Sequence, residues 1–392
     1  MKSPISIGAI LLILFFIFLY MMSCYYIGLK GKNIFSYRNK KMTTRVYWII
    51  FWLLALSYII SALFRSFLSV NNLLTSISTS IGTICLAVIF YLIAVFPIVD
   101  IMRFIFRKAG YRGTTRNYLS RFYGNGITVF LSVFILIGFG AWNAAHPILT
   151  EYNLNINKTA GKIKFLNIVM ISDVHLGTGV KEKGLDNMVA SINKLNPDIV
   201  LFGGDIVDES TTTKLKAYSA KAFKNIKSKY GVYDITGNHE YIEASLQETL
   251  YYLEEGDVKL LQDEAVKIDN SFYIVGRNDP AVTRISKETV KPLSEILKNI
   301  DKTLPVIVLN HRPSNLQEAE NEKVDLQLSG HTHRGQFFPN NLITRMVYED
   351  DYGYLKKGDF NLIVSSGYGT WGPPIRIGTN GEIVNVKLKF KQ

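Results

Sequence analysis

Four long apolar stretches without a charged residue lie within the first 150 residues of this 392-residue chain. A helix needs about 20 apolar residues to cross the hydrocarbon core of a bilayer, which is roughly 30 Å thick. The apolar parts of the four stretches reach that length, and a soluble domain has no place for four of them. We therefore predict four transmembrane helices, at about residues 5–27, 46–64, 81–99 and 127–146.

The charge of the chain divides at about residue 150. The whole sequence has a net charge of +12, which taken alone would favour a nucleic-acid-binding protein. Residues 1–150, however, contain 14 Lys and Arg and a single acid, Asp100, whereas residues 151–392 contain 30 basic and 31 acidic residues. We therefore predict a membrane anchor at 1–150, a separate second domain at 151–392, and no nucleic-acid partner.

The first apolar stretch could instead be a signal sequence that is removed from the mature protein. Its positive region consists of Lys2 alone, and its apolar part is far longer than the roughly 7–15 residues of an ordinary signal core. The sequence before Cys24 is also a poor match to a lipoprotein cleavage site. We expect a permanent span that contains Cys24, and lipid attachment to Cys24 is the alternative.

The loops between the predicted spans differ strongly in positive charge. The second loop has only Arg65, and the N-terminal tail has only Lys2. The first and third loops are basic, with Lys30, Lys32, Arg38, Lys40, Lys41 and Arg45 in the first and Arg103, Arg107, Lys108, Arg112, Arg116 and Arg121 in the third. Because positively charged loops stay in the cytoplasm, we predict a multi-pass protein of the cell membrane whose residues 151–392 lie outside the cytoplasm.

The predicted spans have the composition of an anchor. Transporters and channels place ionisable side chains inside their spans, but the four apolar cores contain no Asp, Glu, Lys or Arg. Both cysteines, Cys24 and Cys85, lie in spans, so residues 151–392 can form neither a disulfide nor a thiolate metal site. A non-catalytic receptor or transport protein is therefore only an alternative interpretation.

Residues 151–392 alternate short apolar runs with amphipathic segments. We expect a pair of strands at about 152–156 and 163–171, joined by a turn at 158–161, because Asn, Lys and Gly favour turns. Short buried strands that alternate with helices are typical of α/β folds. The predicted fold class is therefore an α/β sandwich, preceded by the four transmembrane helices.

Polar motifs directly follow five of the predicted strands. They supply Asp173 and His175, Asp205, Asn238 and His239, His311, and finally His331 and His333. These motifs contain five of the six histidines in the chain. Ligands bind at the carboxyl ends of strands in open α/β sheets, and His and Asp without thiolates suit Mn, Fe, Zn or Ni. The pattern therefore predicts a metal site at one edge of the sheets.

The order of these motifs is specific. Asp-x-His, Gly-Asp-x-x-Asp, Gly-Asn-His-Glu, His and Gly-His-x-His follow one another between residues 168 and 336. In this order they resemble the calcineurin-like metallophosphoesterase superfamily. The segments Ser-Gly-His-Thr-His-Arg-Gly-Gln at 329–336 and Gly-Thr-Trp-Gly-Pro-Pro at 369–374 also resemble its membrane-associated bacterial branch of YkuE- and YaeI-like phosphoesterases.

The resemblance implies a four-layer αββα sandwich that holds two divalent metal ions, with Mn expected first and Fe, Zn or Ni as alternatives. It implies that one ion is bound by Asp173, His175, Asp205 and His333, and the other by Asp205, Asn238, His311 and His331. A hydroxide held between the ions would attack phosphorus, and His239 would be the catalytic proton donor to the leaving oxygen. Asp208 and Glu240 are either residues that orient the ligand histidines or ordinary loop acids.

We therefore predict a membrane-anchored phosphoric ester hydrolase. A phospholipid or a lipid-linked phosphate or pyrophosphate would explain the four spans, and a general phosphodiesterase or phosphomonoesterase with a soluble substrate is the alternative. Glu209 follows the Gly-Asp-x-x-Asp motif, where the protein phosphatases of the superfamily have arginine, which argues against a phosphoprotein substrate. A nuclease is disfavoured by the near-neutral charge of residues 151–392.

Residues that bind the substrate are not assigned. The segment 340–354 is rich in apolar residues and follows the last ligand motif. It is either an apolar loop that accepts a lipid or packs on the bilayer, or a hairpin buried in the core. Lys356, Lys357 and Arg376 could hold an anionic head group, but basic surface residues are common and carry no assignment.

Overall fold

The structure is a computed structural model of the chain, and it describes all residues except 1–6, 36–41, 69–72, 110–125, 243–245 and 286–288. The chain divides into two compact units, Met1–Phe139 and Gly140–Gln392. Part of the sequence argument for orientation rests on residues outside the described ranges. These are Lys2, Arg38, Lys40, Lys41, Arg112, Arg116 and Arg121.

Long apolar helices make up the first unit. Four helices are long and apolar enough to cross a membrane: α1 (Ile7–Phe35), α2 (Met42–Leu68), α3 (Leu73–Lys108) and α5 (Ile127–Ala144). Many of their large apolar side chains are exposed, as a lipid-facing surface requires. The prediction of four long apolar N-terminal helices is confirmed. The last residues of α5, 140–144, belong to the second unit.

The single acid of the first 150 residues is neutralised. Lys30 Nζ lies 2.5 Å from Asp100 Oδ2, and Arg103 Nη1 lies 3.3 Å from Asp100 Oδ1. The Tyr26 hydroxyl donates to the same carboxylate at 2.6 Å. Charges in apolar spans are expensive unless they are paired, so this cluster lowers the cost of placing Asp100 within α3.

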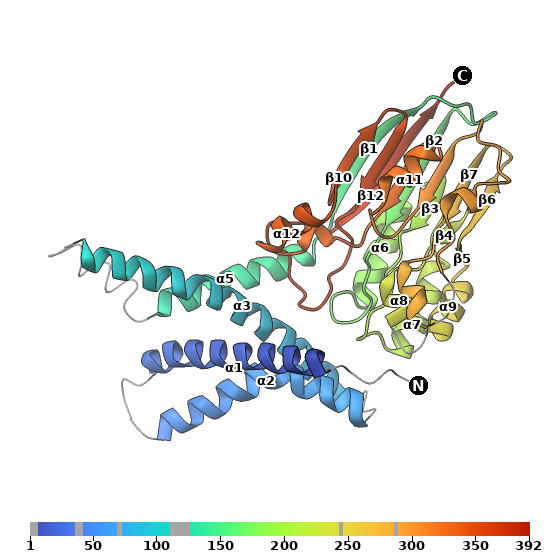
Figure 1. Ribbon diagram of the computed structural model, residues 1–392. Helices are drawn as coiled ribbons and strands as arrows, with labels where there is room; N and C mark the ends of the chain where they lie inside the picture. Colours follow the sequence, from blue (N-terminus) through green and yellow to red (C-terminus); the bar gives the residue numbers. More distant parts are fainter. Residues whose placement is uncertain (1–6, 36–41, 69–72, 110–125, 243–245, 286–288) are drawn as a thin grey trace. The chain divides into compact units, whose positions relative to one another are not determined.

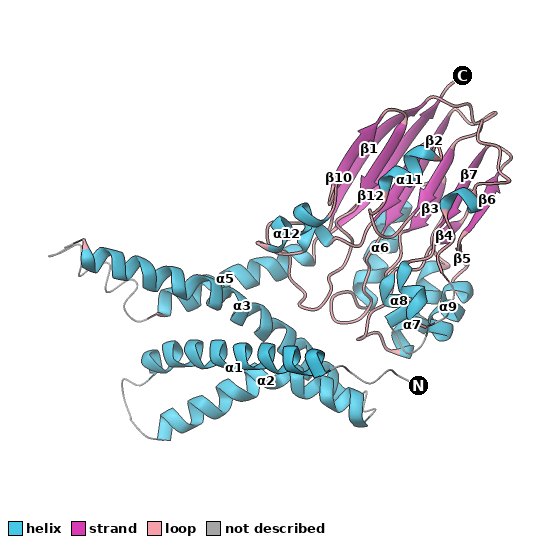
Figure 2. Ribbon diagram, viewed as in Figure 1, coloured by secondary structure: helices cyan, strands magenta, loops and turns pink. Residues whose placement is uncertain are grey.

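Two six-stranded sheets form the centre of the second unit (Figures 1 and 2). In spatial order, the first sheet contains β1 (Ile148–Ile156), β12 (Glu382–Phe390), β2 (Phe165–Ile171), β3 (Ile199–Phe202), β4 (Val232–Asp234) and β5 (Val258–Leu260). The second sheet contains β10 (Gly353–Lys357), β11 (Phe360–Val364), β9 (Leu326–Ser329), β8 (Val306–Leu309), β7 (Phe272–Gly276) and β6 (Glu264–Ile268). The strands predicted at 152–156 and 163–171 are present as β1 and β2, but the prediction that they pair with each other is wrong.

The C-terminal strand β12 separates the two strands that we expected to pair. It runs parallel to β1 and antiparallel to β2. The reason is burial: β2 is almost completely buried, and its partner must be apolar toward the core. β12 supplies Val384, Val386 and Leu388 to that core, whereas β1 has the alternating exposure of an edge strand.

Helices cover the outer faces of both sheets. On the first sheet these are α6 (Glu182–Lys194), α7 (Thr213–Phe223) and α9 (Leu246–Glu255), and on the second α10 (Leu293–Ile296) and α11 (Leu316–Asn321). A third core lies between the sheets and joins residues such as Ile168 and Leu201 to Ile274 and Leu328. Three cores between four layers confirm the predicted αββα sandwich.

Short elements lie in the loops at one edge of the sandwich. They are α8 (Asn238–Ile242), α12 (Asn340–Val347) and the 3₁₀ turns Pro280–Arg284 and His333–Gly335. The strands β2, β3 and β4 are mutually parallel, as are β7, β8 and β9. Their carboxyl ends therefore place the following loops together, and those loops carry the predicted site residues.

Candidate metal centre

The predicted ligands form two adjoining groups. Asp173, His175 and His333 make one group, and Asp205, His311 and His331 make the other, with ligand atoms within 4.8 Å of one another in each. The loops after β2, β3, β8 and β9 contribute these side chains, and Asn238 begins α8 after β4. Residues that are up to 160 positions apart in the sequence are thus brought to one edge of the sandwich.

Ring nitrogens face one another in the first group. His175 Nε2 lies 3.0 Å from His333 Nε2, and His333 Nε2 lies 3.4 Å from Asp173 Oδ1. Burial lowers the pKa of His175 well below its usual value and lowers the pKa of His333 to about 4. Both rings are therefore neutral at pH 7, and their Nε2 atoms lie close enough together to bind one cation.

The second group is centred on Asp205. His311 Nε2 lies 3.1 Å from Asp205 Oδ2, and His331 Nδ1 lies 3.3 Å from His311 Nε2. The same Asp205 oxygen is 3.9 Å from His175 Nε2 in the first group. Asp205 is therefore the side chain that borders both groups.

The charge balance of the second group differs from that of the first. Burial lowers the pKa of His331 to about 3. Burial also lowers the pKa of His311, but the adjacent Asp205 carboxylate outweighs this effect and raises that pKa to about 10. In the absence of metal, His311 therefore carries a proton at pH 7 that a cation would have to displace.

The donor set fits two divalent cations that share Asp205. Among the described residues, the buried Asn238 Oδ1 has no hydrogen-bond partner, and a buried amide oxygen without one is costly. Neutral imidazoles, carboxylates and one amide oxygen are suitable ligands for Mn, Fe or Zn. A cation in each group would satisfy the facing histidine nitrogens, and Asn238 Oδ1 at the start of α8 is available as a further ligand.

The backbone at the ligands is strained. Asp173, His175, Asp205, His331 and His333 all have positive φ, between 47° and 69°. Residues with a Cβ rarely adopt this left-handed region, and each instance costs of order 1–3 kcal/mol. Such strain is concentrated at functional sites, and here it falls on five of the seven predicted ligands.

Two glycines within the ligand motifs, Gly204 and Gly330, permit the close packing of these loops. A Cβ at Gly330 would lie 1.8 Å from Ser172 Oγ and 2.3 Å from Asp173 Oδ2. A Cβ at Gly204, where φ is +85°, would lie 2.6 Å from the Gly237 nitrogen. Any larger residue at either position would displace a ligand loop.

Hydrogen bonds fix the ligand side chains. His311 Nδ1 lies 2.7 Å from the Gly203 carbonyl oxygen, which favours the tautomer that leaves Nε2 free for a cation. The backbone N–H of His331 donates to both oxygens of Asp173 at 3.1 and 3.0 Å. The Ser172 hydroxyl also donates to Asp173.

Glu240 holds the backbone of the Asp205 loop. The interpretation that it orients a ligand histidine is therefore wrong. Its carboxylate accepts hydrogen bonds from the backbone N–H groups of Asp205 at 3.0 Å, Ile206 at 2.7 Å and Gly237 at 2.8 Å. Glu240 is fully buried, so these bonds hold the Asp205 loop against α8. Asp208 likewise accepts from its own loop, through the backbone N–H and the hydroxyl of Ser210.

His239 lies beside the first group. Its ring is 4.8 Å from the His175 ring in an edge-on arrangement, and its backbone N–H donates to Asp205 Oδ1 at 2.8 Å. Two residues that the sequence analysis left without a role surround it. Glu209 Oε2 is 3.7 Å from His239 Nδ1, and the Trp371 ring is 5.9 Å away.

The sequence contained a signal for both neighbours. Glu209 directly follows the Gly-Asp-x-x-Asp motif, and Trp371 lies within Gly-Thr-Trp-Gly-Pro-Pro. Neither motif, however, predicts that Glu209 or Trp371 lies beside His239. Trp371 is 54% exposed, so this neighbour of His239 is accessible from the solvent.

Arg376 is not a head-group ligand. It is completely buried, and its guanidinium donates to the backbone oxygens of Ser366, Gly367, Gly369 and Asn380. These hydrogen bonds occupy the guanidinium and hold the loop after β11 in place. Lys357 pairs with Glu349.

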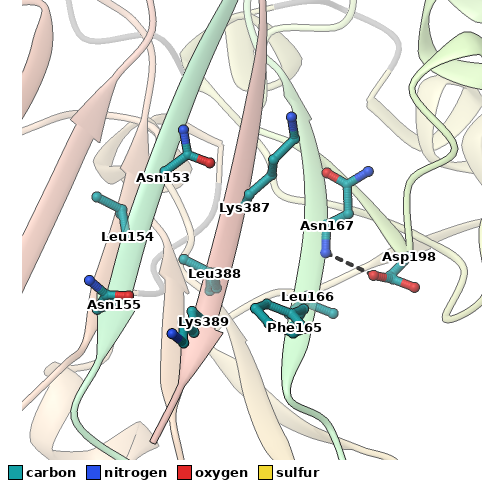
Figure 3. A pocket seen from close by; sticks show the side chains of 10 residues that line it. All are labelled: Asn153, Leu154, Asn155, Phe165, Leu166, Asn167, Asp198, Lys387, Leu388 and Lys389. Atoms are coloured by element: carbon teal, nitrogen blue, oxygen red, sulfur yellow. Dashed lines mark hydrogen bonds between the residues drawn. The ribbon is translucent and has the colours of Figure 1, made fainter.

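A hollow of about 570 Å³ lies at the other end of the first sheet. Figure 3 shows its lining, which includes Phe165 and Leu166 at the start of β2 and Asp198 before β3. The ligand loops follow the opposite, carboxyl ends of these strands. None of the predicted ligands lines this hollow, so it is separate from the candidate metal centre.

Comparison with known proteins agrees with this geometry. The profile of the calcineurin-like phosphoesterase family matches residues 166–335. A metallophosphoesterase of Aquifex aeolicus is 33% identical over 267 residues, which cover 66% of this chain and 99% of that protein. The chain belongs to the calcineurin-like phosphoesterase family. The predicted superfamily and the prediction of a metallophosphoesterase domain are therefore confirmed.

Other members of the family are longer than the matched region. A Helicobacter pylori metallophosphoesterase is 31% identical over 246 residues, which cover 62% of this chain and 64% of that protein. A zebrafish protein described as a transmembrane protein with a metallophosphoesterase domain is 28% identical over 266 residues, or 65% of this chain and 60% of that one. This description and the four apolar helices support a membrane protein.

Proposed function

We propose that this chain is a membrane-anchored, dinuclear-metal phosphoric ester hydrolase, with an anchor at residues 1–150 and a catalytic domain at 151–392. The observation that carries the proposal is the pair of ligand groups that meet at Asp205 beside His239. Family membership supports phosphoester chemistry.

Each residue of the centre has a proposed role. Asp173, His175, Asp205 and His333 would hold one ion, and Asp205, Asn238, His311 and His331 would hold the other. The ions would supply Lewis acidity and a nucleophile at neutral pH when bound, with Mn as the first candidate. The two carboxylates leave a residual charge of about +2 from two divalent ions, which attracts an anionic phosphoester.

His239 would give a proton to the leaving oxygen. Its position beside His175 brings the ring to the edge of the metal centre, where the leaving group of a bound phosphoester would lie. The exposed Glu209 carboxylate, 3.7 Å from Nδ1, would favour the orientation in which Nε2 faces the substrate. Trp371 would cover the substrate on the outer side.

The substrate we favour is a phospholipid or a lipid-linked phosphate or pyrophosphate. A multi-pass anchor keeps the enzyme at the membrane, where such a substrate is concentrated, and the positive loops favour an extracytoplasmic domain. The Gly-Thr-Trp-Gly-Pro-Pro segment supports a place in the YkuE- and YaeI-like branch. A soluble phosphodiester or phosphomonoester is the alternative substrate.

The test is hydrolysis by the purified full-length chain loaded with Mn²⁺. Chromogenic phosphodiester and phosphomonoester substrates would be assayed with the Asp205→Ala and His331→Ala variants, and bound metal would be counted in each. We expect activity in the parent chain only, with at least one ion lost from both variants. A folded parent chain that binds no metal would refute the proposal.

A further inference from the structure

An amphipathic helix stands near the metal centre, and no element in the described part of the chain covers its apolar side. Helix α12 contains no buried residue, and its four large apolar side chains are between 49% and 86% exposed. Phe338, just before the helix, is 52% exposed. Contiguous exposed apolar side chains mark a contact surface. The α12 surface comprises Phe338, Leu342, Ile343, Met346 and Val347.

Backbone contacts join the α12 surface to the end of the last span. The N–H of Phe338 donates to the carbonyl of Ile377 at 2.9 Å, and the N–H of Arg376 donates to the carbonyl of Gly140 at 2.9 Å. Asn143 Nδ2 donates to the Arg376 carbonyl at 3.1 Å. Residues 140–144 are the last of α5, a helix apolar enough to cross a membrane.

The packing at this junction is close. A Cβ on Gly140 would lie 2.7 Å from the Ile377 side chain, and Phe337 forms a bridge with Ile377. Asn143 also donates to the Thr379 carbonyl at 2.7 Å. The position of the α12 surface is therefore fixed relative to the residues at which α5 leaves the apolar layer.

We propose that the α12 surface lies in the interfacial layer of the bilayer that α5 crosses. An amphipathic helix that lies in this layer buries its apolar side about 5–10 Å deep, and eight residues of helix extend about 12 Å along the surface. The partner of the surface is lipid rather than a second copy of the chain. The reason is that the contacts with the end of α5 hold the α12 surface at the level where that helix leaves the membrane. Trp142, 57% exposed in the last turn of α5, is a residue type enriched at that level.

The same helix is connected to the metal centre. The Tyr348 ring, directly after α12, lies 6.2 Å from the His331 ring. Asp351 accepts hydrogen bonds from Thr344 of α12 at 2.5 Å and from Thr332 of the ligand loop at 2.7 Å. Contact of α12 with lipid would hold the ligand loops at the level of the head groups. That consequence for a lipid substrate rests on the proposed function, whereas the membrane contact does not.

The test is fluorescence quenching in the reconstituted full-length chain. Met346, the most exposed residue of the surface, would be replaced by the fluorescent amino acid dansylalanine, which leaves both native cysteines in place. The matched control is the same replacement of Phe165, an apolar residue that is 67% exposed. Phe165 begins β2, about 20 Å of strand away from the ligand loops. Vesicles would contain phosphatidylethanolamine and phosphatidylglycerol, with or without a lipid that carries a nitroxide near its head group.

The proposal requires a difference between the two positions. We expect emission from position 346 to fall about twofold with the nitroxide lipid, as contact within 5–10 Å of the interface implies, and emission from position 165 to stay unchanged. Equal quenching at the two positions, or none at either, would overturn it. Blue-shifted emission at 346 without quenching would mean that protein covers the surface, which overturns it too. Hydrolysis is not measured, so this result and the test of the proposed function can fail separately.

Discussion

The metal centre and the α12 surface depart from the usual distribution of side chains in opposite ways. Soluble domains bury apolar residues and expose charged ones. At the metal centre Asp173 and His175 are completely buried, whereas Met346 on α12 is 86% exposed. Each arrangement is unfavourable unless a partner from outside the chain satisfies it. For buried carboxylates and imidazoles a suitable partner is a cation, and for the exposed apolar side chains of α12 the partner we propose is lipid.

The largest effect on kcat is expected from a change at His239, the proposed proton donor beside the metal centre. His239→Gln should lower kcat about 10²–10⁴-fold, the usual contribution of a positioned proton donor. The ions should be retained, because none of the seven proposed ligands is changed. Kinetics and metal content of the same preparation would check this.

His146→Gln is the matched control, since His146 is exposed and is the one histidine outside the motifs. It should leave kcat unchanged. A loss of metal in His239→Gln would show that His239 has a structural role, and a loss of activity below about tenfold would argue against proton donation.

Metal binding should depend on pH through His311. Its pKa is raised to about 10, while the pKa values of His331 and His333 are lowered to about 3 and 4. Between about pH 5.5 and 7, therefore, only His311 must lose a proton to bind metal, and the apparent Mn²⁺ affinity should rise about tenfold per pH unit. Calorimetry in buffers of different ionisation enthalpy should show about one proton released. An affinity independent of pH in this range would mean that His311 is already neutral.

The α12 surface should matter only for substrates in a membrane. Ile343→Glu combined with Met346→Glu places two charges in the interfacial layer, and hydrolysis of a phospholipid in vesicles should fall about tenfold. Hydrolysis of a soluble chromogenic ester should not change, because neither residue belongs to the metal centre. Paired assays of the two substrates would measure the ratio.

Phe165→Glu is the matched control for the α12 variant, since it places a charge at an exposed apolar site on the far end of the sheet. It should leave both rates unchanged. An equal loss on the soluble ester would show that the α12 variant disturbs the metal centre and does not report membrane contact.

A metal site at one edge of the sandwich could be predicted from the sequence because each polar motif follows a short buried strand, whereas the proposed ligand set came from the resemblance to the family. The carboxyl ends of parallel strands meet at one edge, so His175 and His333 could be brought together without knowledge of the full topology. The pairing of β1 with β12 could not be predicted, since its two strands are separated by most of the second unit. The contact of Glu240 with backbone N–H groups also has no sequence pattern, because it depends on how α8 approaches the Asp205 loop.

The smallest effect on kcat is expected from a change at Glu209. This residue lies at the metal centre but is exposed, as the α12 surface is. It lies beside His239 in the metal centre, but its side chain is 44% exposed. An exposed ion pair contributes about 0.2–1 kcal/mol, so Glu209→Gln should lower kcat by no more than about fivefold. Metal content and KM should stay unchanged, because we expect Glu209 to act only through the orientation of His239. Steady-state kinetics of Glu209→Gln and Glu209→Asp would test this, with partial recovery of kcat expected in the aspartate variant. A loss as large as that of His239→Gln would contradict this prediction. It would mean that Glu209 takes part in catalysis directly, as the acids of the metal centre do.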